Sequence, residues 1–527
     1  MKQLLFVFMA ALWLAPLQAQ VTGDIGKFAE AINVPTLKKH LSYIAGDETQ
    51  GRETGTEGQR KAAAYIESQF KAMGLQPASS LNGYQQYYPL FKDTLIASQL
   101  KIGKQKLVFG KDYTAPVSSN FTQQLKAKDI VFVGYGISSK QYDDYASIDV
   151  NGKVVVFFLG EPKRGDTFVI SGRKRGSEWS FPGQSLKLKT AKEKGAIAAI
   201  IISPTTEAFT PELVDAAVKS RVYYPRNTST SINAVTLSHE AASNLLGKAK
   251  FADLLQKAKA GEPLTGQELP LGSTSFKFSY LKEREQINAS NVLGYIEGTD
   301  KKEELVFLTA HYDHLGMHDG KIYYGADDDG SGTVGVMQMA AAFAKAKAAG
   351  QGPRRTVVFM TVSGEEKGLW GSEYYSENPV FPLDKTSVDL NIDMVGRIDT
   401  ERTTADSLNY VYVIGHDKLS SDLPVINEAM NKQYTNLVLD YKYDDPNDKN
   451  RIYFRSDHYN FAKKGVPILF FYDGMLKADY HKPTDTIDKI YWDLYEKRVR
   501  MIFYTAWEMA NRDAMLKRDI PLPVTAR

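Results

Sequence analysis

Short, continuous apolar runs separated by longer amphipathic segments characterise the second half of this 527-residue chain. Five of these runs predict strands that are buried on both faces, at 305–309, 356–362, 387–392, 410–414 and 467–472. Helical periodicity predicts two long helices, at 333–349 and 494–511. Strands and helices that alternate in this way are typical of an α/β fold, in which helices cover both faces of a mostly parallel, mixed sheet.

A helical pattern precedes the strand-rich part of the chain. Ala63, Ile66 and Phe70 recur at helical spacing, and Gly74 is placed to end the helix that they predict. We therefore expect helix across most of 35–75.

The stretch 96–270 has a different residue pattern, which predicts short strands and turns. Apolar runs at 130–133, 153–158 and 196–202 predict strands, and the segment 185–195 predicts a helix before the last of them. A chain of 527 residues exceeds what one compact core usually holds. We therefore expect a small β-rich domain at 96–270, inserted into a larger domain formed by 20–95 and 271–527.

Residues 1–19 predict a secretory signal peptide. Lys2 gives a positive start, the apolar run 4–14 ends before Pro16, and the small residue Ala19 offers a cleavage site. A membrane anchor is the alternative, but the run is shorter than the roughly 20 residues that a spanning helix needs. We expect an exported protein, periplasmic or extracellular, with no stable membrane insertion after cleavage.

The amino-acid composition limits the partners and the metal ligands that this chain can have. The hydrophobic content is 43% and the charged content 24%, which is typical of a folded soluble protein. A net charge of +3 gives no reason to expect a nucleic-acid partner. The chain has no cysteine, so disulfides and thiolate ligands are excluded, and a bound metal has to use His, Asp and Glu.

Five polar clusters lie in loops or just after predicted strands, where open α/β sheets place their sites. They occupy 310–316, 325–332, 363–368, 391–394 and 480–486. Each cluster alone has an ordinary explanation, such as an acidic helix N-terminus or a solvated charge pair. Together they supply the imidazole and carboxylate groups that two metal ions with one shared carboxylate would need.

The set His311, Asp328, Glu365-Glu366, Asp393 and His481 resembles the di-zinc exopeptidase family. That family includes secreted bacterial leucine aminopeptidases and glutamate carboxypeptidase II, and the segment 291–298 is also similar to it. The stretch 96–270 resembles the protease-associated domain that is often inserted in these enzymes, on the helix-to-strand pattern at 190–196.

The resemblance implies two zinc ions per chain and assigns each ligand. The implied ligands are His311, Asp328, Glu366, Asp393 and His481. Asp328 would bridge the two ions, His311 and Asp393 would complete one site, and Glu366 and His481 would complete the other.

The catalytic residues implied by the same resemblance are Glu365, Asp313 and Tyr480. Glu365 would be the general base, Asp313 would orient a metal-binding histidine, and Tyr480 would stabilise the oxyanion. The bond between Asp328 and Asp329 would be cis, and His458 would be structural.

We expect a peptide substrate and action at the N-terminus. A free amine is cationic, and Glu365 and Asp393 provide carboxylates to receive it, whereas a carboxypeptidase needs clustered arginines. Only Arg451 and Arg455 lie near the later motifs, among several aspartates. Carboxypeptidase or dipeptidase action, a one-zinc glutaminyl cyclase and an inactive binding homologue such as the transferrin receptor stay open as alternatives. The acidic run 444–448 is either a calcium loop or a solvated turn, and no motif indicates an oligomeric state.

Overall fold

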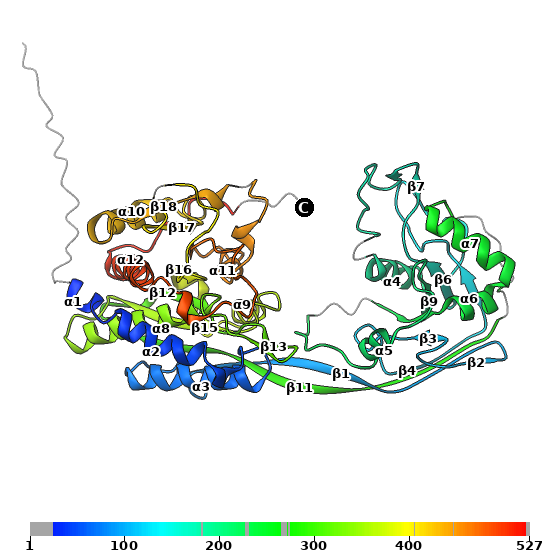
Figure 1. Cartoon of the computed structure of the whole chain (residues 1–527), viewed down its shortest axis with the longest axis horizontal. Helices are drawn as coiled ribbons and strands as arrows, with labels where there is room; N and C mark the ends of the chain where they lie inside the picture. Colours follow the sequence, from blue (N-terminus) through cyan, green and yellow to red (C-terminus); the bar gives the residue numbers. More distant parts are fainter. Residues whose placement is uncertain are drawn as a thin grey trace, which may run out of the picture. The chain divides into compact units, whose positions relative to one another are not determined.

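The computed structural model describes residues 25–180, 183–226, 231–264, 271, 274–404, 406–445 and 447–522. The predicted signal peptide, 1–19, lies outside these described residues. The chain forms two compact units (Figure 1). The sheet unit combines the chain before Pro89 with the chain from Asn288 onward, and the inserted unit is Pro89–Ile287.

The sheet unit is built on a mixed sheet whose strands lie in the order β18-β17-β19-β16-β12-β15-β11-β1. Their bounds are β1 Gln85–Ile102, β11 Phe276–Ile296, β12 Lys301–His311, β15 Arg355–Val362, β16 Thr386–Ile392, β17 Tyr410–Ile414, β18 Val438–Asp440 and β19 Ile468–Tyr472. The central strands β15, β12, β16 and β19 are parallel, while β17 and β11 pair antiparallel with their neighbours β19 and β15. The five apolar runs that predicted buried strands all form strands of this sheet, and the predicted mixed α/β fold is confirmed.

Helices pack on both faces of the sheet, because alternate residues of each central strand point in opposite directions. On β12, Val306 and Leu308 join the core formed with the long helices, whereas Leu305 and Phe307 join a second core. The helices of this unit are α1 Gly26–Ala29, α2 Val34–Ile44, α3 Glu57–Ala72, α8 Gly330–Ala348, α9 Trp370–Glu377, α10 Asp422–Tyr434, α11 His458–Ala462 and α12 Trp492–Asn511. Helices α8 and α12 correspond to the two long helices that the sequence predicted.

The segment 35–75, expected to be mostly helical, forms two helices separated by a break. Helix α2 ends at Ile44, and a short 3-10 turn at Asp47–Thr49 separates it from α3. The break is fixed by Thr56, whose side chain accepts a hydrogen bond from the Gln59 backbone N–H and so begins α3. The predicted apolar face of α3 is buried, and Gly74 follows its end with φ +77°.

The inserted unit contains a second sheet with the strand order β3-β10-β9-β6-β5. The strands that lie within the inserted unit, in this sheet or outside it, are β2 Gln105–Leu107, β3 Tyr113–Thr114, β4 Gln123–Ala127, β5 Ile130–Phe132, β6 Val154–Phe158, β7 Lys163–Arg164, β8 Thr167–Phe168, β9 Ala198–Ile202 and β10 Asn233–Leu237. Its helices are α4 Gln184–Glu193, α5 Pro211–Val218, α6 His239–Leu246 and α7 Lys248–Ala260. The three predicted strands and the predicted helix are present, but α5, α6 and α7 make the unit richer in helix than its sequence suggested.

The inserted unit also extends beyond 96–270, the limits expected from the sequence. Its ends fall inside the long strands β1 and β11, which begin or end in the other unit. A strand that continues without a turn leaves no break in the residue pattern, so the pattern could not locate these ends. No helix in the described part of the chain combines the length and apolar character needed to cross a membrane.

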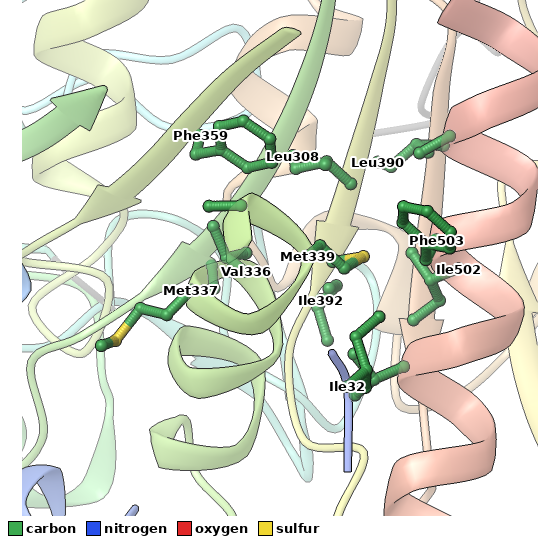
Figure 2. Close-up of a cluster of buried hydrophobic side chains, with 14 of the residues drawn as sticks. Ile32, Leu308, Val336, Met337, Met339, Phe359, Leu390, Ile392, Ile502 and Phe503 are labelled. Atoms are coloured by element: carbon green, nitrogen blue, oxygen red, sulfur yellow. The ribbon is translucent and has the colours of Figure 1, made fainter. Parts of the chain in front are cut away.

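The core beneath the sheet is formed mainly by α8, α12 and the central strands. Figure 2 shows Met339 of α8 beside Leu390 and Ile392 of β16 and facing Phe503 of α12. Each of these side chains is fully buried. The two long helices therefore hold the strands in register from one side, and the loops at the strand ends are built on this base.

Phe503→Ala should destabilise the chain strongly. The ring is fully buried and packs edge-on against Phe343 at 5.2 Å between ring centroids. Losing it should lower the free energy of unfolding by about 3–5 kcal/mol, measured by denaturant titration. The control is Val425→Ala on α10, a residue 69% exposed, which should change stability by less than about 0.5 kcal/mol. Equal losses in the two variants would contradict this account of the core.

Candidate metal centre

The sheet brings predicted site residues together because neighbouring parallel strands end at the same edge. His311 is the last residue of β12, Glu365 and Glu366 come shortly after β15, and Asp393 directly follows β16. Strands β15, β12 and β16 are adjacent and parallel. Their carboxyl ends therefore place four side chains of the predicted site at one edge of the sheet.

Two loops complete the cluster. Asp328 lies just before α8, and His481 lies between β19 and α12. One carboxylate oxygen of Asp328, Oδ1, is 3.3 Å from His311 Nε2, and the other, Oδ2, is 3.2 Å from His481 Nε2. The two oxygens of one carboxylate thus face two different histidines, which is the arrangement expected of a bridging ligand.

Each histidine has a further carboxylate beside the same nitrogen. His311 Nε2 is 3.6 Å from Asp393 Oδ1, and His481 Nε2 is 3.0 Å from Glu366 Oε2. Tetrahedral zinc, with bonds near 2.0–2.1 Å, keeps its ligand atoms roughly 3.3 Å apart. The observed separations are close to this value, so each group has the spacing of ligands around a metal ion.

Buried polar atoms without partners also fit a bound metal. His311 Nε2 and Asp328 Oδ2 are buried and accept or donate no hydrogen bond within the described residues. Leaving such atoms unpaired is costly in a folded protein. A cation between the histidine and carboxylate atoms would satisfy them, and the nitrogen and oxygen donors suit zinc.

The electrostatics point in the same direction. Burial disfavours the charged form of His481, but its contacts with Asp328 and Glu366 outweigh burial and raise its pKa to about 10. Burial likewise opposes ionisation of Glu366, but His314 and His481 lower its pKa to about 2. A carboxylate such as Glu366 is therefore ionised at neutral pH, and a bound metal ion would balance its negative charge.

The neighbouring aspartates hold the loop and leave Asp328 free to face the histidines. Asp329 accepts hydrogen bonds from three backbone N–H groups, those of His311, Gly332 and Met394. It therefore begins α8 and fixes the end of β12, although it lies close enough to be taken for a ligand. The bond between Asp328 and Asp329 is cis, as the resemblance implied.

Asp485 ties the loop of His481 to the loop of Asp328. Its carboxylate accepts hydrogen bonds from the backbone N–H groups of Asp327 and Asp328 at 3.1–3.2 Å. Asp327 in turn accepts from the Gly396 N–H. The two loops that supply Asp328 and His481 are thereby joined through buried hydrogen bonds.

Asp313 lies beside His311 as expected, but it contacts the ring mainly through its backbone. The carbonyl oxygen of Asp313 is 3.1 Å from His311 Nδ1, while the nearest carboxylate oxygen is 3.6 Å away. The carboxylate accepts hydrogen bonds from the Thr54 hydroxyl and from the Glu365 N–H. Asp313 therefore positions the loop that carries Glu365 as well as the ring of His311.

A pocket opens beside Glu365, Asp328 and Asp393. Its space, open solvent included, is about 340 Å³, and part of its wall is apolar, with Ile452 and Phe470 among the lining residues. The predicted general base thus faces a space that a peptide end could enter.

Tyr480 and Arg455 line the same pocket. An N–H of the Arg455 guanidinium donates to the Tyr480 hydroxyl at 3.0 Å. Burial raises the pKa of Tyr480 above its ordinary value, so the hydroxyl keeps its proton and can donate it in a hydrogen bond. Arg455, which the sequence placed only near the later motifs, is therefore part of the pocket.

Arg52 supports the centre and was missed in the sequence. Its guanidinium is fully buried and donates to five backbone carbonyls, those of Ile44, Tyr312, Tyr324, Gly325 and Asp328. Burial lowers the pKa of Arg52, and the charges of the nearby aspartates of the cluster partly offset this effect. A single arginine in a polar loop gives no local signal that it will be buried, so the sequence could not reveal this role.

His458 and the acidic run 444–448 lie outside the cluster. His458 is 2.8 Å from the Tyr453 carbonyl and stacks on Phe470, in agreement with the structural role expected for it. Asp444 accepts from Lys418 at 3.0 Å, and Asp448 accepts from nearby backbone N–H groups. These contacts favour the turn over the calcium loop.

Comparison with known proteins relates part of the chain to a family of peptidases. Residues 291–506, which include every predicted ligand, match the model for Peptidase family M28. The resemblance drawn from the motifs is thus confirmed for this M28 segment.

Curated relatives match part of the chain. A probable leucine aminopeptidase from Arthroderma otae is 28% identical over 216 residues, which is 40% of this chain and 55% of the relative. A probable glutamate carboxypeptidase from Arabidopsis thaliana is 28% identical over 223 residues, 41% of this chain and 30% of the relative. The chain thus spans about half or less of the length of these relatives.

The fold is also found among solved structures. An aminopeptidase from Aneurinibacillus sp. strain AM-1 superposes with a TM-score of 0.50 and 20% identity, covering 95% of this chain and 99% of that chain. At this identity the likeness establishes the fold alone.

Arg52→Met should weaken both the fold and the metal centre. The change leaves five backbone carbonyls without their donor and removes a positive charge from beside the aspartates, so the free energy of unfolding should fall by about 3–5 kcal/mol. Metal content after dialysis should fall as well, as measured by elemental analysis. Arg60→Met is the matched control, because the Arg60 side chain is half exposed and pairs with Glu57 on the surface of α3. A variant at Arg52 that matches this control would refute the role assigned to it.

Proposed function

We propose that the chain is an exported two-zinc exopeptidase that removes residues from the N-terminus of peptides. The observation that carries the proposal is Asp328, whose two oxygens face two separate histidine–carboxylate groups beside a pocket. His311 and Asp393 would complete one zinc site, and Glu366 and His481 the other. Export rests on the predicted signal peptide at 1–19.

The chain's own residues have clear tasks in such a reaction. Bound zinc ions would supply a Lewis acid for the scissile carbonyl and lower the pKa of an attacking water. Glu365 lines the pocket and would take the proton from that water and pass it to the leaving amine. Tyr480 would donate its hydroxyl proton to the negative charge that develops on the carbonyl oxygen.

Charge around the pocket favours binding of an amine. Asp328, Glu365 and Asp393 all line it, and a free N-terminus is cationic at neutral pH. Arg455 also lines the pocket, and an arginine can grip a carboxylate in bidentate fashion. Carboxypeptidase action is therefore the second candidate, although one N–H of Arg455 is already directed at Tyr480.

The direction of cleavage is tested by offering one peptide in three forms: free, N-acetylated and C-amidated. Aminopeptidase action predicts cleavage of the free and the amidated peptides, while acetylation removes the cationic amine and blocks cleavage. The products are followed by mass spectrometry, with a chelator-treated sample as the control. Cleavage of the acetylated peptide together with resistance of the amidated one would reverse the assignment.

Glu365 and Glu366 are adjacent but should respond differently to the same substitution. Glu365→Gln should retain both zinc ions and lose roughly 10²–10⁴-fold in rate, since it removes only the proton acceptor. Glu366→Gln should lose zinc as well, because its Oε2 faces His481. Zinc content and turnover are measured on the same preparations, with the exposed Glu377→Gln of α9 as control.

The two roles would be disproved if both variants held equal zinc and turned over equally slowly. Circular dichroism of each variant establishes that the fold is retained.

A further inference from the structure

His314 is a buried histidine at the metal centre to which the family motif gives no role. It comes three residues after His311, and its side chain is fully buried. Its Nδ1 lies 2.8 Å from Glu366 Oε1 and 4.0 Å from Asp328 Oδ2. Within the described residues, neither ring nitrogen makes a hydrogen bond of regular angle. A polar ring buried in this way needs a function that accounts for it.

The two oxygens of Glu366 have different neighbours. Oε2 is 3.0 Å from His481 Nε2, which in turn is 3.2 Å from Asp328 Oδ2. Oε1 is turned to the other side and meets His314 Nδ1. One oxygen therefore belongs to the ligand group of the second ion, and the other belongs to His314.

His314, Asp328 and Glu366 lie close enough together to hold an ion, but the spacing and the number of ligands argue against His314 as a further ligand. Ligand atoms around tetrahedral zinc are roughly 3.3 Å apart, whereas His314 Nδ1 is 4.0 Å from Asp328 Oδ2. A catalytic zinc also keeps three protein ligands and one open position. Asp328, Glu366 and His481 already supply three, so a fourth would close the position that a reacting water needs.

The surroundings prevent the His314 ring from turning away. Gly325 has φ +54°, and a Cβ built on it would collide with the ring of His314 and with the carbonyl of Asp328. The backbone N–H of His314 donates to the carbonyl of Arg52 at 3.4 Å. The ring is thus enclosed by the same loops that hold Asp328.

We infer that His314 is a positioning residue for the second ion, holding Glu366 by its Oε1 so that Oε2 alone is presented to the metal. The inference rests on the proposed two-metal site and deepens it. A neighbour that restrains a ligand in this way is commonly worth about 10–100-fold in metal affinity. Because it acts through Glu366, His314 should affect the second ion and leave the first unchanged.

The test compares the full chain with His314→Leu and His314→Gln by titrating zinc against a competing chromophoric chelator. His314→Leu should bind the first ion normally and the second roughly 10–100-fold more weakly. His314→Gln retains an N–H donor and should recover part of that loss. His318→Leu, an exposed histidine of β13 (Gly316–His318), is the matched control and should bind both ions like the wild type.

The outcomes separate this inference from the proposed function. A wild-type chain that binds fewer than two ions would contradict the two-metal proposal itself. Two ions in the wild type with an unchanged second affinity in His314→Leu would overturn only the role of His314.

A measurement on the wild type remains decisive if the variants fail to fold. In the cobalt-substituted protein, a histidine that binds cobalt through one nitrogen gives a strongly shifted proton NMR signal from its other ring N–H. Positioning by His314 predicts no more than two such signals, from His311 and His481. A third signal would make His314 a ligand and overturn the inference.

Discussion

Buried negative charge is the constraint on which the sheet unit depends. The carboxylates at the strand ends lie in a region closed to solvent, where an unbalanced charge is far more costly than at the surface. Some of this charge is met by arginines. Arg397 pairs with Asp479 and lies 3.9 Å from Asp485, and Arg498 lies 3.8 Å from Asp473. Asp328, Glu366 and Asp393 instead have histidine nitrogens as their nearest charge partners among the described residues, so a metal ion or a proton would balance these carboxylates.

The same constraint explains how the loops are ordered. The carboxylate oxygens of Asp329 and Asp485 accept hydrogen bonds from backbone N–H groups. These hydrogen bonds hold the loop around Asp328 without the help of a metal ion. Arg52 holds the carbonyl side of the same loop. A site assembled on both donors and acceptors in this way should keep its order without an ion, because the large apolar core beneath it contains no candidate metal ligand. The centre thus differs from small zinc domains, which fold only with their ion.

The strands and the clustering of the candidate site residues could be predicted because each has a local signal. Buried strands such as β15 and β16 are continuous apolar runs, and the ligands follow them directly in the sequence. Arg52 and His314 could not be found in this way, since their roles depend on residues that are distant in sequence and brought near only by the fold. The ends of the inserted unit were missed for a related reason, because β1 and β11 pass through them without a turn.

Arg455 requires an explanation in a pocket assigned to a cationic substrate. A hydroxyl that accepts one hydrogen bond is a stronger donor in another, because linked hydrogen bonds polarise one another at low dielectric. Arg455 donates to Tyr480, whose own proton is then free to point toward a developing oxyanion. The positive charge therefore serves the tyrosine and does not have to meet a substrate carboxylate. On the proposed function, the carboxylates near the candidate metal centre, and not Arg455, would determine which end of a peptide the pocket accepts.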